Sequence, residues 1–110
     1  KGTQIRDFLH VKDVASIFLK LLLDDHKFNG AINICSGSGI SIRDLVQKIG
    51  LFMDKSQLIE FSDIEPPLND PSLIIGDNSI LNRTLNLEMD HDLDNRILET
   101  INWWKNKIVF

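Results

Sequence analysis

Apolar and polar residues alternate along the chain in patterns that predict short strands followed by amphipathic helices. A strand-like run at 5–11 precedes apolar residues at helical spacing, which predict a first helix with Asp13 as its N-cap. The apolar positions of this helix are Val14, Ile17, Phe18, Leu21 and Leu22. A polar turn should then end the helix, with Asp24, Asp25, Asn29 and Gly30.

The middle of the chain repeats this alternation. The segment AINIC at 31–35 is short, apolar and partly β-branched, which predicts a buried strand. A glycine turn, SGSG at 36–39, follows. Ser41 with Asp44 then fits the capping signature of a second helix. That helix would carry Ile42, Leu45, Val46, Ile49, Phe52 and Met53 on its apolar face. LIEF at 58–61 predicts a further strand.

The last third is less regular. The segment 62–72 holds all three prolines and should be a surface loop. A short strand is expected at 73–75, ending at Gly76–Asp77 and followed by a short helix. A final helix should run from about His91, with Leu93, Ile97, Ile101, Trp104 and Ile108 as its buried stripe. Short strands that alternate with amphipathic helices indicate an α/β fold.

Composition narrows the class of protein. A chain of 110 residues has the size of one domain, and a net charge of −4 without any charged block argues against nucleic-acid or anionic-membrane binding. The apolar runs are too short to span a bilayer. A single cysteine, Cys35, cannot form an internal disulfide, which favours a reducing, cytoplasmic location. The chain has no tyrosine, so these residues cannot supply a phenolic acid or base.

Two candidate sites have simpler interpretations. The SGSG stretch could bind phosphate, but Ile42 stands where a dinucleotide fingerprint needs its third glycine. Gly37 and Gly39 more simply permit a tight turn with positive φ. The spacing of His10, His26, His91 and Cys35 does not resemble a metal site, and Cys35 should be a small core residue.

Two further features remain open at this point. The Trp103–Trp104 pair could stack on a ligand, but the helical spacing of Trp104 favours packing in the core. Arg6 could form a surface ion pair of little energetic value, or its guanidinium could bind a phosphate with two parallel hydrogen bonds. Spacing alone does not separate these alternatives for Arg6.

The segment GTQIRDFLHVKDVA, residues 2–15, resembles the G-x-x-x-R-D-F/Y-x-H/Y-V-x-D-x-A segment of the extended short-chain dehydrogenases/reductases. These are the nucleotide-sugar epimerases, dehydratases and reductases. AINICSGSGISI at 31–42 is similar to the Y-N-I-G-S-G-x-x-x-S-I segment of that family. DPSLIIGDNS at 70–79 resembles its loop, short strand and Asp-x-Ser helix start, and TINWW at 100–104 resembles its closing helix.

The resemblance implies that residues 1–110 are a C-terminal nucleotide-sugar-binding domain or fragment, with the N-terminal Rossmann part absent. In such enzymes the Rossmann part binds NAD or NADP through a Gly-rich loop and carries a Tyr-x-x-x-Lys catalytic pair. We therefore predict no catalytic residue and no cofactor bound by this chain alone. The start at Lys1–Gly2, which resembles the tail of a turn, adds to the expectation of a fragment.

The same resemblance assigns roles to five residues. Arg6 would contact the diphosphate of a nucleotide-diphosphate sugar. Asp7 and Asp13 would hold the strand–helix junction by accepting backbone N–H bonds. Asn33 would orient the glycine turn that contains Gly37.

Departures from the family pattern leave a second function open. Pro67 and Leu68 stand where the family often has Arg-Pro, although Asp70 is kept, and Ile80 replaces a lysine. The Leu-Gly-Trp-x-Pro stretch reads LNLEM at 85–89. The loss of a second phosphate-binding arginine suggests, as the alternative, a non-catalytic binding or interaction module on the same scaffold. Apolar surface at a cut interface would also promote self-association into a homo-oligomer.

Overall fold

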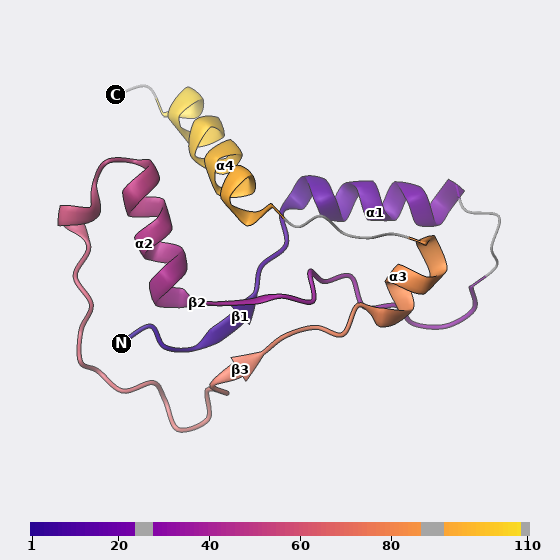
Figure 1. The fold of residues 1–110 in the computed structure, drawn as a ribbon, viewed down its shortest axis with the longest axis horizontal. Coiled ribbons are helices and arrows are strands. Elements are labelled where there is room, and N and C mark those ends of the chain that lie inside the picture. Colours follow the sequence, from indigo (N-terminus) through magenta and orange to yellow (C-terminus); the bar gives the residue numbers. More distant parts are fainter. Residues whose placement is uncertain (24–27, 87–91, 109–110) are drawn as a thin grey trace.

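The computed structural model describes residues 1–23, 28–86 and 92–108 (Figure 1). The helices and strands in chain order are β1 (Ile5–Asp7), α1 (Val11–Leu23), β2 (Gly39–Ser41), α2 (Ile42–Phe52), β3 (Leu73–Ile74), α3 (Ser79–Leu85) and α4 (Leu93–Lys107). A single 3₁₀ turn, Ser56–Leu58, follows α2. The α/β class predicted from the sequence is confirmed.

The sheet is small and mixed, with β1 in its centre. β2 pairs with β1 in antiparallel register, with Ile5 opposite Ser41, and β3 pairs with β1 in parallel register, with Ile5 opposite Leu73. Successive side chains of a strand point to opposite faces. Arg6 and Asp7 therefore project from the central strand to opposite sides of the sheet.

The first helix begins earlier than the sequence pattern predicts. The carbonyl of His10 accepts hydrogen bonds from the backbone N–H groups of Asp13 (2.9 Å) and Val14 (3.1 Å), so the helix starts at Val11. The predicted strand at 5–11 consequently ends at Asp7. Asp13 is not the N-cap, because it lies within the first turn. The predicted cap of α2 is confirmed, since the Ser41 hydroxyl accepts from the backbone N–H of Asp44 at 3.0 Å.

Two predicted strands do not form. The segment 31–35 is not a strand, since the sheet of the described residues consists of β2, β1 and β3, and its side chains are half-buried or exposed. The segment 58–61 is also irregular. Leu58 ends the 3₁₀ turn with its side chain exposed, and Phe61 instead places its ring 4.0 Å from the guanidinium of Arg43.

The last third agrees better with the sequence pattern. The loop at 62–72, the short strand after it and the helix after Asp77 are confirmed. In α4, Ile97 and Ile101 are buried as predicted, but Trp104 is 53% exposed and so is not a core residue. Several predicted turn and helix-end residues lie outside the described residues: Asp24, Asp25, His26 and His91.

The fold is thin and leaves much apolar surface exposed. Its extents are 50 × 39 × 20 Å, and its radius of gyration of 16.8 Å exceeds the value of about 13 Å expected for a compact domain of this length. The accessible surface is 8399 Å², against about 6,200 Å² for a compact protein of this mass. The buried apolar side chains among the described residues are Ile17, Leu81, Ile97 and Ile101.

Helix α1 shows this exposure most clearly. It buries Ile17, whereas the side chains of Leu22 and Leu23 on the same helix are 80% and 74% exposed. Figure 1 shows α1 at one end of the molecule, with α4 near its first turn. Over the three described ranges, no helix is both long and apolar enough to cross a membrane.

Candidate functional site

Arg6 belongs to a polar cluster on one side of the sheet, which we call the Arg6 cluster (Gln4, Arg6 and Asp70). The Arg6 guanidinium donates to Asp70 Oδ1 at 2.5 Å and to the backbone carbonyl of Ile5 at 2.8 Å. The other carboxylate oxygen of Asp70 accepts from the Gln4 amide at 2.9 Å. The Arg6 and Asp70 side chains are 20% and 31% exposed, so the ion pair is only partly shielded from water. Within the described residues, these two acceptors occupy only part of the five N–H donors of the guanidinium.

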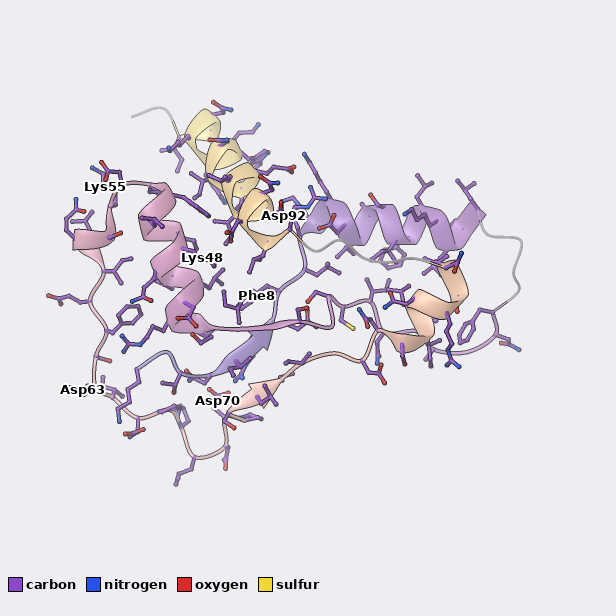
Figure 2. All side chains as sticks on the ribbon, in the orientation of Figure 1. Phe8, Lys48, Lys55, Asp63, Asp70 and Asp92 are labelled. Atoms are coloured by element: carbon purple, nitrogen blue, oxygen red, sulfur yellow. The ribbon has the colours of Figure 1, made fainter. Side chains whose placement is uncertain are left out.

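Asp70 reaches this cluster from the proline-rich loop, where Figure 2 labels it close to the start of β3. Its backbone N–H donates to the carbonyl of Pro67 at 2.9 Å, which closes a tight turn. Pro71 follows directly and restricts the backbone of Asp70 to extended conformations. The loop therefore holds the Asp70 carboxylate beside Arg6 on a conformationally restricted segment of backbone.

Asp7 forms a second cluster on the opposite face of β1. Its Oδ1 accepts from the hydroxyl of Ser36 at 2.5 Å and from the backbone N–H of Ser36 at 2.9 Å. Its Oδ2 accepts from the backbone N–H groups of Gly37 at 2.9 Å and Gly76 at 3.2 Å. One carboxylate thus joins β1 to the glycine turn and to the segment after β3. Asp7 accepts backbone N–H bonds as expected, but they come from the glycine turn and from the segment after β3 rather than from the junction between β1 and α1.

The surroundings of Asp7 favour its ionised form. Partial burial raises the pKa of Asp7, but the hydrogen bonds from Ser36, Gly37 and Gly76 outweigh burial and hold the pKa below its ordinary value. Burial and the nearby Asp7 carboxylate raise the pKa of the Cys35 thiol. Cys35 is only half-buried and lies against Gly76, so it is not the core residue predicted.

The Asp7 carboxylate occupies the position in the glycine turn where a bound phosphate would lie. The backbone N–H groups of Ser36 and Gly37, which a phosphate would need, donate to the Asp7 carboxylate. Gly37 has a φ of +74°, as expected for a tight turn, whereas Gly39 lies in β2 without a positive φ. This geometry supports the interpretation of SGSG as a structural turn.

The side-chain hydrogen bond of Asn33 is made outside the glycine turn. Its amide donates to the carbonyl of Asp77 at 3.4 Å, because the segment 31–35 runs beside the start of α3. The contact expected of Asn33 is made instead by Asn78, whose amide donates to the carbonyl of Ser36 at 2.9 Å. No sequence pattern pointed to Asn78.

Asp13 contributes to an ion-pair network between α1 and α4. The Arg96 guanidinium donates to both carboxylate oxygens of Asp13, at 2.9 Å from its Nε, and to Glu99 at 3.0 Å. Lys12 pairs with Glu99 at 2.8 Å. The hydrogen bond and charge of Asp13 raise the pKa of Arg96, and the bond from Lys12 is the largest influence lowering the pKa of Glu99. Asp13 therefore joins two helices rather than a strand and a helix.

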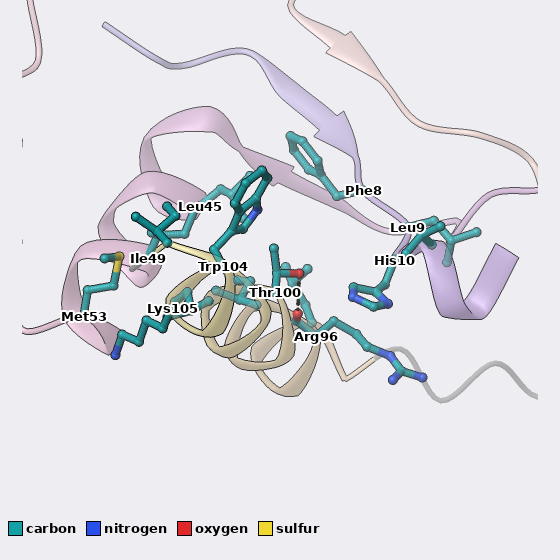
Figure 3. A pocket seen from close by; sticks show the side chains of 15 residues that line it. Phe8, Leu9, His10, Leu45, Ile49, Met53, Arg96, Thr100, Trp104 and Lys105 are labelled. Atoms are coloured by element: carbon teal, nitrogen blue, oxygen red, sulfur yellow. Dashed lines mark hydrogen bonds between the residues drawn. The ribbon is translucent and has the colours of Figure 1, made fainter. Parts of the chain in front are cut away.

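A groove of about 710 Å³ lies between α2, α4 and the connection from β1 to α1 (Figure 3). Its walls are mostly apolar, and Trp104 lines it together with Phe8 and Ile49. The indole of Trp103 packs edge-on against Trp104, with ring centroids 4.8 Å apart. In the described ranges, His, Cys, Asp and Glu side chains do not gather in groups of three that could hold a metal ion.

Comparison with known proteins identifies relatives among sugar-nucleotide enzymes. The model of the NAD dependent epimerase/dehydratase family matches residues 1–35. ADP-L-glycero-D-manno-heptose-6-epimerase of Nitratidesulfovibrio vulgaris is 34% identical over 67 residues, which cover 61% of this chain and 20% of the relative. UDP-glucose 4-epimerase of Pasteurella multocida is 30% identical over 107 residues, which cover 94% of this chain and 31% of the relative.

A solved structure agrees with these relatives at the level of the fold. UDP-N-acetylglucosamine 4-epimerase from Methanobrevibacter ruminantium M1, in complex with UDP-N-acetylmuramic acid, superposes with a TM-score of 0.78. The two proteins are 24% identical, and the match covers 98% of this chain and 34% of the other. The chain thus has an α/β fold found in sugar-nucleotide epimerases. It belongs to the NAD-dependent epimerase/dehydratase family. It spans between a fifth and about a third of the length of these proteins.

Proposed function

We propose that residues 1–110 form the nucleotide-sugar-binding portion of an NAD(P)-dependent epimerase, dehydratase or reductase. In this proposal Arg6 binds the substrate diphosphate. NAD or NADP is bound by a Rossmann part outside these residues, which also supplies the catalytic tyrosine that the chain lacks. This portion contributes binding energy remote from the reacting carbon and so positions the sugar for hydride transfer. The single cysteine favours placing this activity in the cytoplasm.

The observation that carries this proposal is the state of the Arg6 side chain. It extends from the central strand of the sheet, is fixed on one side by Asp70, and stays partly accessible to solvent. A guanidinium with N–H donors left over suits bidentate binding of a phosphate. Family membership makes a nucleotide diphosphate the most suitable anion.

Two features of the fold support a second packed part. The apolar surface of α1 is largely exposed, and large exposed apolar patches mark interaction surfaces. The segment 31–35 has the composition of a strand but lacks a sheet partner among the described residues. A Rossmann sheet beside this segment would satisfy both features.

Calorimetric titration with ADP and UDP tests the role of Arg6, in the protein as its gene encodes it. Arg6→Ala should weaken diphosphate binding by about 1.5–3 kcal/mol, the usual cost of losing a hydrogen bond to a charged group. Arg6→Lys should recover only part of that loss, because an ammonium lacks the planar fork. Arg83→Ala, at an exposed arginine on α3, is the matched control and should bind normally. Equal affinity of wild type and Arg6→Ala would refute the phosphate role.

One observation favours the alternative of a non-catalytic binding module. Asp70 neutralises Arg6, and Pro67–Leu68 replace the second arginine of the family pattern, so the Arg6 cluster has no net positive charge. A binding module would bind ADP or UDP weakly or not at all, and would not need NAD. Turnover of a UDP- or ADP-sugar that depends on added NAD(P) would exclude this alternative.

A further inference from the structure

We propose that Asp70 and Gln4 are positioning residues that hold the Arg6 guanidinium in its diphosphate-binding orientation. This inference rests on the proposed phosphate role of Arg6.

The geometry forms a chain of three side chains. Gln4 and Arg6 are two residues apart on the extended segment at β1, so their side chains lie on the same face. The Asp70 carboxylate bridges them, with one oxygen 2.5 Å from Arg6 and the other 2.9 Å from the Gln4 amide. With both oxygens engaged, the carboxylate cannot rotate freely, and together with the Ile5 carbonyl, 2.8 Å from the guanidinium, it restrains the Arg6 side chain.

The backbone beneath Asp70 reinforces this arrangement. The turn hydrogen bond from Asp70 to Pro67 and the restriction imposed by Pro71 fix the position from which the carboxylate reaches Arg6. By contrast, Leu68 within the same turn is fully exposed. The turn therefore buries little apolar surface of its own. Its main structural effect is to place Asp70 beside Arg6.

Positioning and charge act in opposite directions on anion binding. A free arginine loses rotamer freedom when it binds, which weakens affinity by roughly two- to tenfold for each side chain immobilised. A guanidinium already held by Asp70 avoids that loss. The negative charge of Asp70 opposes a phosphate, but the paired Arg6 guanidinium and the water that reaches this partly exposed carboxylate both weaken the repulsion. We therefore expect positioning to prevail.

Variants at Asp70 separate these two effects by calorimetric titration with ADP and UDP. Asp70→Ala removes both the charge and the hydrogen bonds, and should weaken binding roughly two- to tenfold. Asp70→Asn removes the charge but keeps an acceptor for Arg6, and a rotated Gln4 amide can accept from the new NH₂ group. It should therefore lose less affinity than Asp70→Ala. Gln4→Leu leaves the charge unchanged and should weaken binding in the same direction by a smaller factor.

Two controls complete the design. Asp63→Ala removes an exposed carboxylate from the same loop and should leave the affinity unchanged. In an Arg6→Ala background, Asp70→Ala should have no further effect, because a positioning residue acts only through the residue it positions. A purely structural role for Asp70 would still alter binding in that background.

The outcomes separate this inference from the proposed function. Tighter binding by both Asp70→Ala and Asp70→Asn would mean that the carboxylate competes with the phosphate, and would overturn the inference. Unchanged binding in the Asp70 and Gln4 variants, with a clear loss in Arg6→Ala, would overturn the inference and leave the phosphate role intact. No loss in Arg6→Ala would refute the proposed function itself.

Discussion

The Asp7 carboxylate bonds both the hydroxyl and the backbone N–H of Ser36, a polar residue that is 5% exposed. The same carboxylate holds Gly37 and Gly76, so three segments distant in sequence meet at one side chain. Arg6, the preceding residue, bonds Asp70 on the other face. Arg6 thus contacts the chain just before β3, at Asp70, and Asp7 contacts it just after β3, at Gly76.

Replacement of Asp7 should destabilise the fold. In Asp7→Asn the amide keeps one acceptor oxygen but presents an NH₂ group to backbone donors, leaving partly buried N–H groups unsatisfied. We expect the free energy of unfolding to fall by about 1.5–3 kcal/mol. Urea unfolding followed by circular dichroism measures this loss. Asp63→Asn, at an exposed site, should change stability by less than about 0.5 kcal/mol and serves as the control.

The contribution of Asp7 should depend on pH. Its pKa in the folded state lies below its ordinary value, which is close to that of the unfolded chain at about 3.9. The stabilisation is therefore complete above that pH and is lost as the pH falls through the folded-state pKa. Urea titrations at neutral and acidic pH should show the difference between wild type and Asp7→Asn shrinking in acid. A constant difference would contradict the linkage.

Gly37 should not tolerate a side chain. Its φ of +74° is unfavourable for residues with a Cβ, and a Cβ there would lie 2.6 Å from the Asn78 amide nitrogen. Gly37→Ala should cost about 1–2 kcal/mol for the backbone alone, and more if Asn78 loses its bond to Ser36. Thermal unfolding would report this loss. Ser38→Ala, at the exposed neighbouring position, should unfold close to wild type.

The contact between Asp13 and Arg96 should be measurable as a coupling energy. Exposed ion pairs contribute little, but this pair is bidentate and its side chains are only 21% and 30% exposed. A double-mutant cycle with Asp13→Ala and Arg96→Ala should give about 1 kcal/mol in the free energy of unfolding. The same cycle in high salt should give less. A coupling of zero would show that the Asp13–Arg96 pair does not help to hold α1 against α4.

The exposed side of α1 should promote self-association when residues 1–110 are produced by themselves. Leu22 presents 80% of its area to solvent, and Leu19 presents 57%. Sedimentation at several concentrations should show association that Leu19→Lys and Leu22→Lys reduce. Ser16→Lys adds the same charge at an exposed polar position of the helix and should have less effect. A monomer at all concentrations would contradict this expectation.

Local sequence signals predicted those features whose cause is local. The Ser41 cap succeeded because the hydroxyl bonds an N–H group three residues away. The buried positions Ile97 and Ile101 follow from helical periodicity, and the loop at 62–72 follows from proline, which cannot donate to a sheet. The positive φ at Gly37 follows from the freedom of glycine.

Predictions failed where a distant segment decided the outcome. Asp13 is of a residue type that commonly caps helices, but its carboxylate instead binds Arg96, which is 83 residues away in the chain. The segment 31–35 has strand propensity, yet a strand forms only where another strand offers a ladder. Trp104 fits the apolar stripe of α4 but lines a groove instead of the core.

The sequence by itself determined the order of the helices, the Ser41 cap, the proline-rich loop and the resemblance to a family, because these depend on residues near one another in the chain. Tertiary structure alone decided the partners of Arg6 and Asp7. Asp70 lies 64 residues from Arg6, and Gly76 lies 69 residues from Asp7. Contacts over such separations exist only after the sheet has formed, because strand register brings the side chains together.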